Sequence, residues 1–241
     1  MRSMTGILTV LCLVLLAGVL YASPDLPSNL LALVPEDRRT EVQEILADPT
    51  FTRELDFKAH ANLQVFTYLL DHPDLNATLA RALHIAPYEV VRSGPGQYRG
   101  ADADGNAGTI EVFGAEWHER VFVERGVSSG WWFGEIGGRV VALVAFAPEA
   151  DSVRGTVTVW ARIDQGFVDG LLRFLKPFLG GLLDRKLREQ FSIPERVAEA
   201  AAQHPDRFCP LLGAVSDGSP EERQALAGLA GCWQVEGRRT Q

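Results

Sequence analysis

Hydrophobic and polar residues alternate with a period of two in several short segments through the middle of the chain. In residues 156–163, for example, Val157 and Val159 alternate with Thr158 and Trp160. Alternation of this kind is typical of strands that bury one face. It predicts strands at residues 54–60, 88–92, 97–101, 109–113, 116–125, 131–136 or 139–147, and 155–164.

The segments between these strands predict hairpins. Asp104-Gly105 and Gly137-Gly138 favour tight turns, and residues 147–155 favour a longer hairpin loop. Connections of this length are too short for crossover helices. The sequence therefore predicts a meandering antiparallel sheet.

A helical period follows the last strand. In residues 165–191, apolar residues such as Phe167 and Leu171 recur at helical spacing, while the charged residues lie mainly elsewhere. This predicts a long amphipathic helix with a wide apolar face. Shorter helices are predicted at residues 36–46 and on both sides of Pro73.

The order of elements is one strand, two short helices, several antiparallel strands and a long helix. It resembles the helix-grip fold of the START and polyketide cyclase-like superfamily (SRPBCC). The resemblance is carried by residues 55–75, LDFKAHANLQVFTYLLDHPDL, and by the helix from Gln165. The predicted fold class is α+β, with a curved antiparallel sheet gripping a long C-terminal helix over residues 54–191. The resemblance implies a cavity between sheet and helix that accepts a lipid, sterol, isoprenoid or other apolar molecule.

The N-terminal segment, residues 1–22, has a different composition. Arg2 carries its only charge, and residues 6–22 are apolar or small. This is typical of an export signal, although roughly 17 to 25 apolar residues can also span a bilayer. The segment is therefore either a cleaved signal peptide or a membrane anchor. We expect a periplasmic or extracellular protein, anchored if residues 6–22 are retained, with residues 23–53 forming a Pro-rich stem and a short helix.

Two cysteines, Cys209 and Cys232, lie beyond the N-terminal segment. An even pair in an exported chain is most simply a disulfide. Two unpaired buried thiols are the alternative. Both cysteines fall in residues 192–241, which predict a small helical extension that the disulfide would tie together.

Charge and motifs exclude several classes of function. The net charge is −8, and no basic run is longer than Arg238-Arg239, so nucleic acid is not an expected partner. Residues 102–106, DADGN, resemble the start of a calcium loop, but Phe113 stands where the closing acidic ligand belongs. We expect no cofactor and no metal site, and no motif assigns a catalytic residue.

Aromatic residues are the candidates for the lining of the cavity, because their rings supply large contact areas. The candidates are Phe66, Trp117, Trp131, Phe133, Phe146, Phe174 and Phe178. The same rings could equally form ordinary core. Trp160 lies on the face of its strand that carries Thr158 and Arg162, which is either the solvent side or a polar-lined pocket.

Three functions stay open. The first, which we favour, is an exported or membrane-anchored binding protein for a lipid or other apolar small molecule. The second is a cyclase-like or hydrolase-like enzyme, which would require polar residues such as His118, Arg162 or Tyr98 to converge inside the cavity. The third is an interaction domain with a filled core. An apolar cavity on the order of several hundred Å³ would favour the first.

Overall fold

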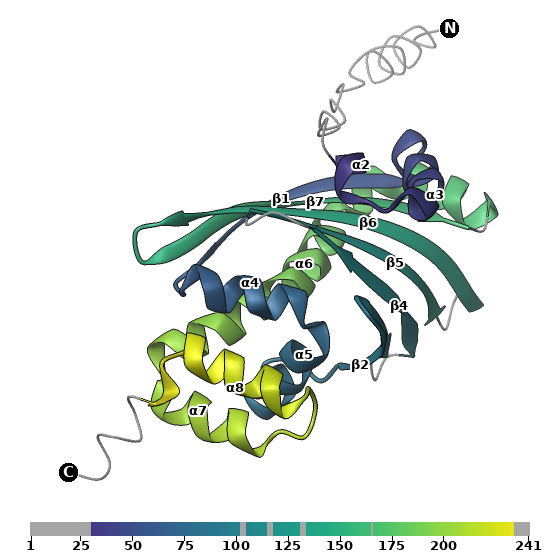
Figure 1. Ribbon diagram of the computed structural model, residues 1–241. Coiled ribbons are helices and arrows are strands. Elements are labelled where there is room, and N and C mark those ends of the chain that lie inside the picture. The colour runs from purple at the N-terminus through teal and green to yellow at the C-terminus, as the bar shows by residue number, and fades with distance from the viewer. Residues whose placement is uncertain (1–29, 102–104, 115–117, 131–133, 165, 234–241) are drawn as a thin grey trace, which may run out of the picture.

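Seven antiparallel strands form one curved sheet in the order β1-β7-β6-β5-β4-β3-β2 (Figure 1). The computed structural model describes residues 30–101, 105–114, 118–130, 134–164 and 166–233. Its strands are β1 (Phe51–Ala59), β2 (Glu89–Gly94), β3 (Gln97–Ala101), β4 (Asn106–Phe113), β5 (Glu119–Gly130), β6 (Gly134–Glu149) and β7 (Ser152–Ile163). Its helices are α2 (Leu30–Leu33), α3 (Glu36–Ala47), α4 (Leu63–Asp71), α5 (Pro73–Ala82), α6 (Gly166–Gln203), α7 (Pro205–Ala214) and α8 (Pro220–Leu229).

The helices cover both faces of the sheet. The long helix α6 runs along the concave face, with α4 and α5 beside it and with α7 and α8 beyond them, whereas α2 and α3 lie on the convex face (Figure 1). Every strand pair from β2 to β7 is a sequential hairpin, and only β1 joins the sheet out of order, beside β7. The predicted α+β arrangement of a curved antiparallel sheet and a long helix is confirmed.

The corner between α4 and α5 follows from its local sequence. Asn62 caps α4, because its side chain accepts a hydrogen bond from the Gln64 amide at 2.7 Å. Pro73 then occupies the first turn of α5, where its missing N–H leaves no partner unsatisfied. His72 ends the first helix and precedes the second. These polar residues therefore have a structural role at the corner.

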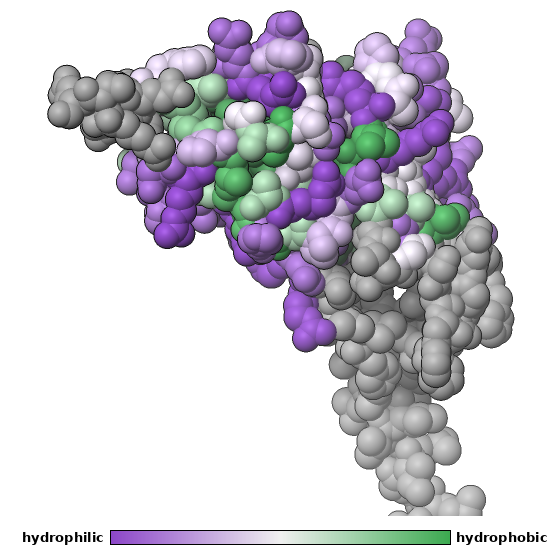
Figure 2. Space-filling view, turned by 90° about the horizontal axis from the view of Figure 1, so that it is seen from below, coloured by the Kyte–Doolittle hydropathy of each residue, from purple (hydrophilic) through white to green (hydrophobic). Residues whose placement is uncertain are grey.

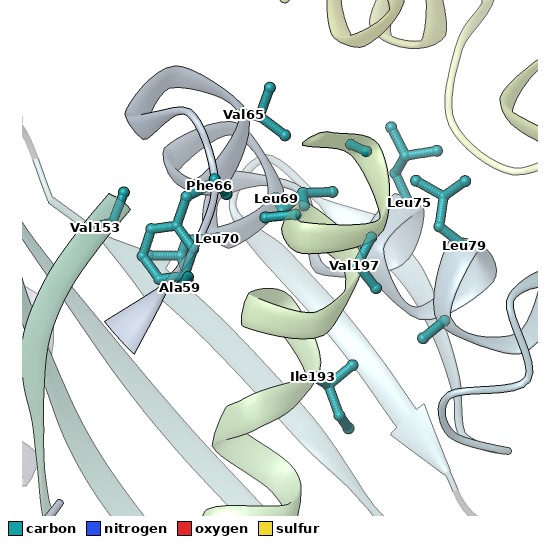
Figure 3. Close-up of a cluster of buried hydrophobic side chains, with 14 of the residues drawn as sticks. Ala59, Val65, Phe66, Leu69, Leu70, Leu75, Leu79, Val153, Ile193 and Val197 are labelled. Atoms are coloured by element: carbon teal, nitrogen blue, oxygen red, sulfur yellow. The ribbon is translucent and has the colours of Figure 1, made fainter. Parts of the chain in front are cut away.

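The main hydrophobic cluster lies on the concave side. Leu69 and Leu70 of α4 meet Ile193 and Val197 of α6, over inward-facing residues of the sheet (Figure 3). Buried residues of α7 and α8 join the same cluster. The last two helices are thus part of the core that holds α6 against the sheet.

A second cluster lies on the convex side, between the sheet and α2–α3. It contains Leu30, Val42 and Ile45 from the helices, with Trp160 from the C-terminal half of β7. Trp160 is only 2% exposed, so the sequence-based placement in solvent or in a polar pocket is wrong. The sequence does not predict that α2 packs over Trp160, because α2 lies within residues 23–53, which the sequence predicts as a Pro-rich stem and a short helix.

Two predicted turns are corrected. Gly137-Gly138 lies inside β6, where Gly138 pairs with Gly126 of β5, and is not a turn. Glycine occurs there because a Cβ at Gly138 would lie 3.3 Å from the Arg162 carbonyl oxygen of the next strand. The hairpin between β6 and β7 is tight, since β6 extends to Glu149 and β7 begins at Ser152.

The long helix extends beyond its predicted end at residue 191. α6 continues through Pro194 to Gln203, although proline removes one internal hydrogen bond. Tertiary contact outweighs that loss, because Ile193 and Val197 on either side of the proline are buried in the concave cluster. Part of the predicted extension is therefore the final turns of the gripped helix.

The predicted disulfide between Cys209 and Cys232 is present and joins α7 to the segment after α8, with Cα atoms 5.5 Å apart. Ion pairs fasten the same region to the rest of the domain, from Arg92 to Glu222 at 2.6 Å and from Arg81 to Asp217 at 3.1 Å. Figure 2 shows the molecule from below, relative to the view of Figure 1. Hydrophobic residues on this face lie in patches bordered by polar residues.

No helix in the part of the chain that the structure describes is both long and apolar enough to cross a membrane. Residues 1–22, where the sequence predicts a signal peptide or anchor, lie outside that part.

Candidate ligand-binding site

A cavity of about 540 Å³ lies between the concave face of the sheet and helices α4, α5 and α6. Most of its lining is apolar, and cavities of this size accept small organic ligands. From the helices come Phe66, Leu69, Leu70, Pro73, Asn76, Leu187, Gln190, Phe191, Ile193, Pro194 and Glu195. The large apolar residues of the sheet that face it are Phe51, Phe57, Val90, Ile110, Phe122, Val140, Val144, Val157, Val159 and Ile163.

One end of the cavity is lined by four glycines in register across four neighbouring strands. The row is Gly100 of β3, Gly108 of β4, Gly126 of β5 and Gly138 of β6. Glycine in a strand often marks a close approach of another backbone or a ligand. The absence of four side chains at this level leaves open space above the sheet.

The four glycines have different local causes. A Cβ at Gly108 would lie 2.5 Å from the carbonyl oxygen of Arg125, so the neighbouring strand excludes any side chain there. A Cβ at Gly100 would meet nothing closer than 3.7 Å. At Gly100 a larger residue would therefore project into the cavity without displacing backbone.

The mouth of the cavity lies next to the glycine row. Among the lining residues, Ala101, Ala107, Thr109, Gly126 and Val127, near the glycine row, and Gln190 of α6 are exposed. Exposed lining residues mark the place where the cavity meets solvent. The bare backbone of the row thus forms the wall just inside the opening.

Glu124 is the acidic residue of the sheet wall. It lies on the inward face of β5, between Ile110 of β4 and Val140 of β6 in the strand register. Burial raises its pKa to about 7, because an apolar environment disfavours the carboxylate. It has no hydrogen bond or ion pair within the part of the chain that the structure describes.

Other polar groups line the cavity. Burial, followed by the charge of Glu199, raises the pKa of Glu195 on α6 to about 7. Burial is also the main cause of a raised pKa at Tyr88, and the nearby charge of Glu124 adds to it. Asn76 is 4% exposed, and its side-chain oxygen has no hydrogen-bond partner among the described residues. The same burial makes the Asn-Ala-Thr triplet at Asn76 inaccessible to glycosylation in the folded protein.

The arginine in the lining does not neutralise these acids. Arg125 follows Glu124 on β5, so its side chain points to the opposite face of the sheet. Its guanidinium donates to Glu41 of α3 and to Glu111 of β4. The cavity therefore receives its ionisable character from carboxyl groups.

The predicted lining residues have different outcomes. Phe66 lines the cavity, whereas Phe146 packs edge-on against it at 5.4 Å between ring centroids and does not line the cavity. Trp117, Trp131 and Phe133 lie outside the described residues. Phe174 and Phe178 belong to α6, but their side chains also lie outside the described part and stay predictions.

Sequence reasoning missed most of the lining. Phe122, Val140 and Phe191 are ordinary members of alternating or helical patterns, and nothing local distinguishes them from core. The glycine row is visible in the sequence only after the strands are aligned in register. Knowledge of that register requires the pairing of the strands, which alternation does not specify.

The three polar residues named as candidates for an enzyme, His118, Arg162 and Tyr98, do not converge in the cavity. Arg162 donates to the Glu44 carbonyl oxygen of α3 at 3.0 Å, on the convex face. The Tyr98 hydroxyl donates to the Asp71 carbonyl oxygen at 3.0 Å, and His118 is exposed. Among the described residues, no group of three or more His, Cys, Asp or Glu side chains could hold a metal ion.

No protein-family model matches the chain, and no curated protein matches it. A conserved protein from Geobacillus kaustophilus is similar in structure, with a TM-score of 0.47, 13% identity and coverage of 62% of this chain and 97% of that chain. A START superfamily protein from Mycobacterium smegmatis has a TM-score of 0.40 and 14% identity, with 61% and 97% coverage. The Zhui aromatase/cyclase from a Streptomyces species has a TM-score of 0.40 and 16% identity, with 62% and 94% coverage.

Element order and sheet topology place the chain in a structural class, the α+β domains of helix-grip type. This is the fold that the resemblance to the START and polyketide cyclase-like superfamily predicts. Within that class, the chain has an apolar cavity with unpaired carboxyl groups in its walls.

Proposed function

We propose that this protein binds an apolar small molecule in the cavity between its sheet and α6. The observation that carries the proposal is the cavity itself, about 540 Å³ and lined mainly by apolar side chains. Burial of an apolar ligand there is favoured at roughly 25 cal/mol for each Å² removed from water. A lipid or another largely hydrophobic compound is the ligand class that suits this lining.

The glycine row favours a binding cavity over a filled core. Cores are close-packed, and a domain that only needed stability would fill the space above Gly100 with a side chain. A Cβ there would make only ordinary contacts, with Ile110 and Val90 at 3.7 Å. A side chain at position 100 would therefore fit the backbone. Glycine at this position leaves space for a ligand.

The protein acts, in this proposal, outside the cytoplasm. The disulfide between Cys209 and Cys232 supports export, because such bonds persist in oxidising compartments. The charge and apolarity of residues 1–22 support the same location. The mass of the protein recovered after expression of the full chain distinguishes the two forms, because a cleaved signal peptide removes the N-terminal segment and a retained anchor does not.

Native mass spectrometry tests the binding function directly. The protein is expressed from the full-length chain, purified without detergent, and analysed for bound molecules, which are then extracted and identified. We expect a stoichiometric hydrophobic ligand. A ligand-free mass that persists after incubation with lipid extracts would contradict the proposal.

Filling the cavity gives a second test. Gly100→Val adds a side chain just inside the mouth, and we expect it to weaken binding of a neutral apolar probe such as N-phenyl-naphthylamine by roughly tenfold, through lost contact area. Arg99→Val is the matched control, because Arg99 is the exposed neighbour on the same strand. Equal affinities for the two variants would place the probe elsewhere on the molecule.

A further inference from the structure

Two walls of the cavity each carry a carboxyl group without a partner. Glu124 lies on the sheet wall and Glu195 on the α6 wall. Neither makes a hydrogen bond or an ion pair with the residues that the structure describes. Both side chains are half-buried. An unpaired carboxylate in a largely apolar, partly buried position is unfavourable, so such groups are normally neutralised, paired or used for binding.

The protein supplies little positive charge to either group. The guanidinium of Arg125 is bound to Glu41 and Glu111 on the convex face. Arg188 lies near enough to Glu195 to favour its ionisation in part. Of the two carboxyl groups, Glu124 is the one without such a neighbour among the described residues, because Ile110, Val140 and the weakly acidic Tyr88 lie around it.

We infer that the ligand of this cavity is an amphiphilic amine, with an apolar body in the cavity and a protonated nitrogen that pairs with Glu124. This rests on the proposed binding function and specifies its ligand class. The ammonium group donates to the carboxylate and supplies the charge that the walls lack. Asn76, buried and unsatisfied in the wall formed by α5, adds polar character to the same cavity.

Other amphiphiles fit the charge of the cavity less well. A fatty acid would bring a third carboxyl group into a space that already holds two, and wherever these groups are ionised, like charges in an apolar medium repel strongly. An alcohol could bond to a protonated Glu124, but a neutral hydrogen bond is weaker than a charge-assisted one. The net charge of −8 also attracts cations to the molecule as a whole.

Three ligands of equal chain length test the inference: dodecylamine, dodecanol and dodecanoate. Each competes with N-phenyl-naphthylamine for the wild-type protein expressed from the full chain. We expect dodecylamine to displace the probe at a concentration at least about tenfold lower than dodecanol, and dodecanoate to be the weakest. Equal potency of the three, or preference for dodecanoate or dodecanol, would overturn the inference while leaving the binding function intact.

Variants assign the effect to one residue. Glu124→Gln keeps the size of the side chain and removes its charge, so the preference for amine over alcohol should fall to within about twofold. Glu195→Gln should reduce the preference less, and Glu54→Gln, at an exposed strand position, should leave it unchanged. A preference that survives in the Glu124→Gln variant would refute the pairing with Glu124.

The two proposals fail in different ways. If the neutral probe and all three ligands fail to bind the wild-type protein, the binding function itself is refuted. If the probe binds and Gly100→Val weakens it, but amine and alcohol do not differ, only the ligand class is wrong. The wild-type comparison needs no variant, so misfolding of a substituted protein cannot obscure this result.

Discussion

The two faces of the sheet are built from the same strands yet have opposite character. On the convex face, α2 and α3 complete a closed cluster around Trp160, and Arg125 is paired with Glu41 and Glu111. On the concave face, glycines leave space and Glu124 has no partner among the described residues. The difference shows that the same alternating strands support stability on one side and leave room for binding on the other.

Adjacent valines of β6 provide the largest contrast in stability. Val141 is fully buried under the convex helices, whereas Val140 is half-buried and lines the cavity. Val141→Ala should lower the free energy of unfolding by about 2–3 kcal/mol, because it leaves a void in a closed cluster. Val140→Ala should cost about 1 kcal/mol or less, since its side chain already borders open space.

Denaturant unfolding measures both changes, with the slope against denaturant as a check that the two variants unfold in the same way. Equal losses would mean that the cavity wall is as closely packed as the convex cluster.

Arg125 tests the convex ion pairs. Removing its guanidinium in Arg125→Met leaves the carboxyl groups of Glu41 and Glu111 close together, and we expect a loss of about 1–2 kcal/mol near neutral pH. The hydrogen bond from Arg125 lowers the pKa of Glu41 below 4.5, so the stabilisation is present above that pH and is lost as pH falls through the depressed pKa. Thermal unfolding at pH 7 and pH 3 measures this dependence.

Arg154→Met is the matched control, because Arg154 pairs with Glu149 at an exposed hairpin. Exposed pairs of this kind contribute about 0–1 kcal/mol. A loss there as large as that of Arg125→Met would remove the distinction between partly buried and exposed pairs.

Glu124, one residue before Arg125, should give stability the opposite dependence on pH. Its pKa is raised from 4.5 to about 7, so the folded state holds the proton more tightly than the unfolded chain between these values. Stability from this group is therefore present below about pH 4.5 and is lost as pH rises towards 7. Glu124→Gln should raise the free energy of unfolding by about 1–2 kcal/mol at pH 8 and leave it unchanged at pH 4.

The measurement is denaturant unfolding of the ligand-free protein at the two pH values, with Glu54→Gln as the exposed control. Tyr88 and Glu195 also line the cavity. Glu195 is present in both wild type and variant, and burial raises the pKa of Tyr88, so that its hydroxyl stays protonated at both pH values. A destabilising effect at pH 8 would indicate that the carboxylate has a favourable partner in the folded state.

Particular residues show how far the sequence could predict the site. Phe66 was identified because its helix has a clear apolar face, and the disulfide because only two cysteines follow residue 22. Alternation predicts Phe146 in the lining, although its ring packs edge-on against Phe66 and does not line the cavity, because alternation assigns a face of the strand and not a depth. Glu124 was not singled out, since a glutamate within a strand usually faces solvent.

Local pattern determined the element types, their order and the α+β class of this protein, because periods of 2 and 3.6 residues are written in neighbouring positions. Tertiary structure decided the register that aligns Gly100, Gly108, Gly126 and Gly138, the cover that buries Trp160, and the placement of Glu124 in an apolar cavity wall. These features depend on residues far apart in the chain. Strand pairing and burial bring such residues together, and a local sequence pattern does not specify contacts between residues far apart in the chain.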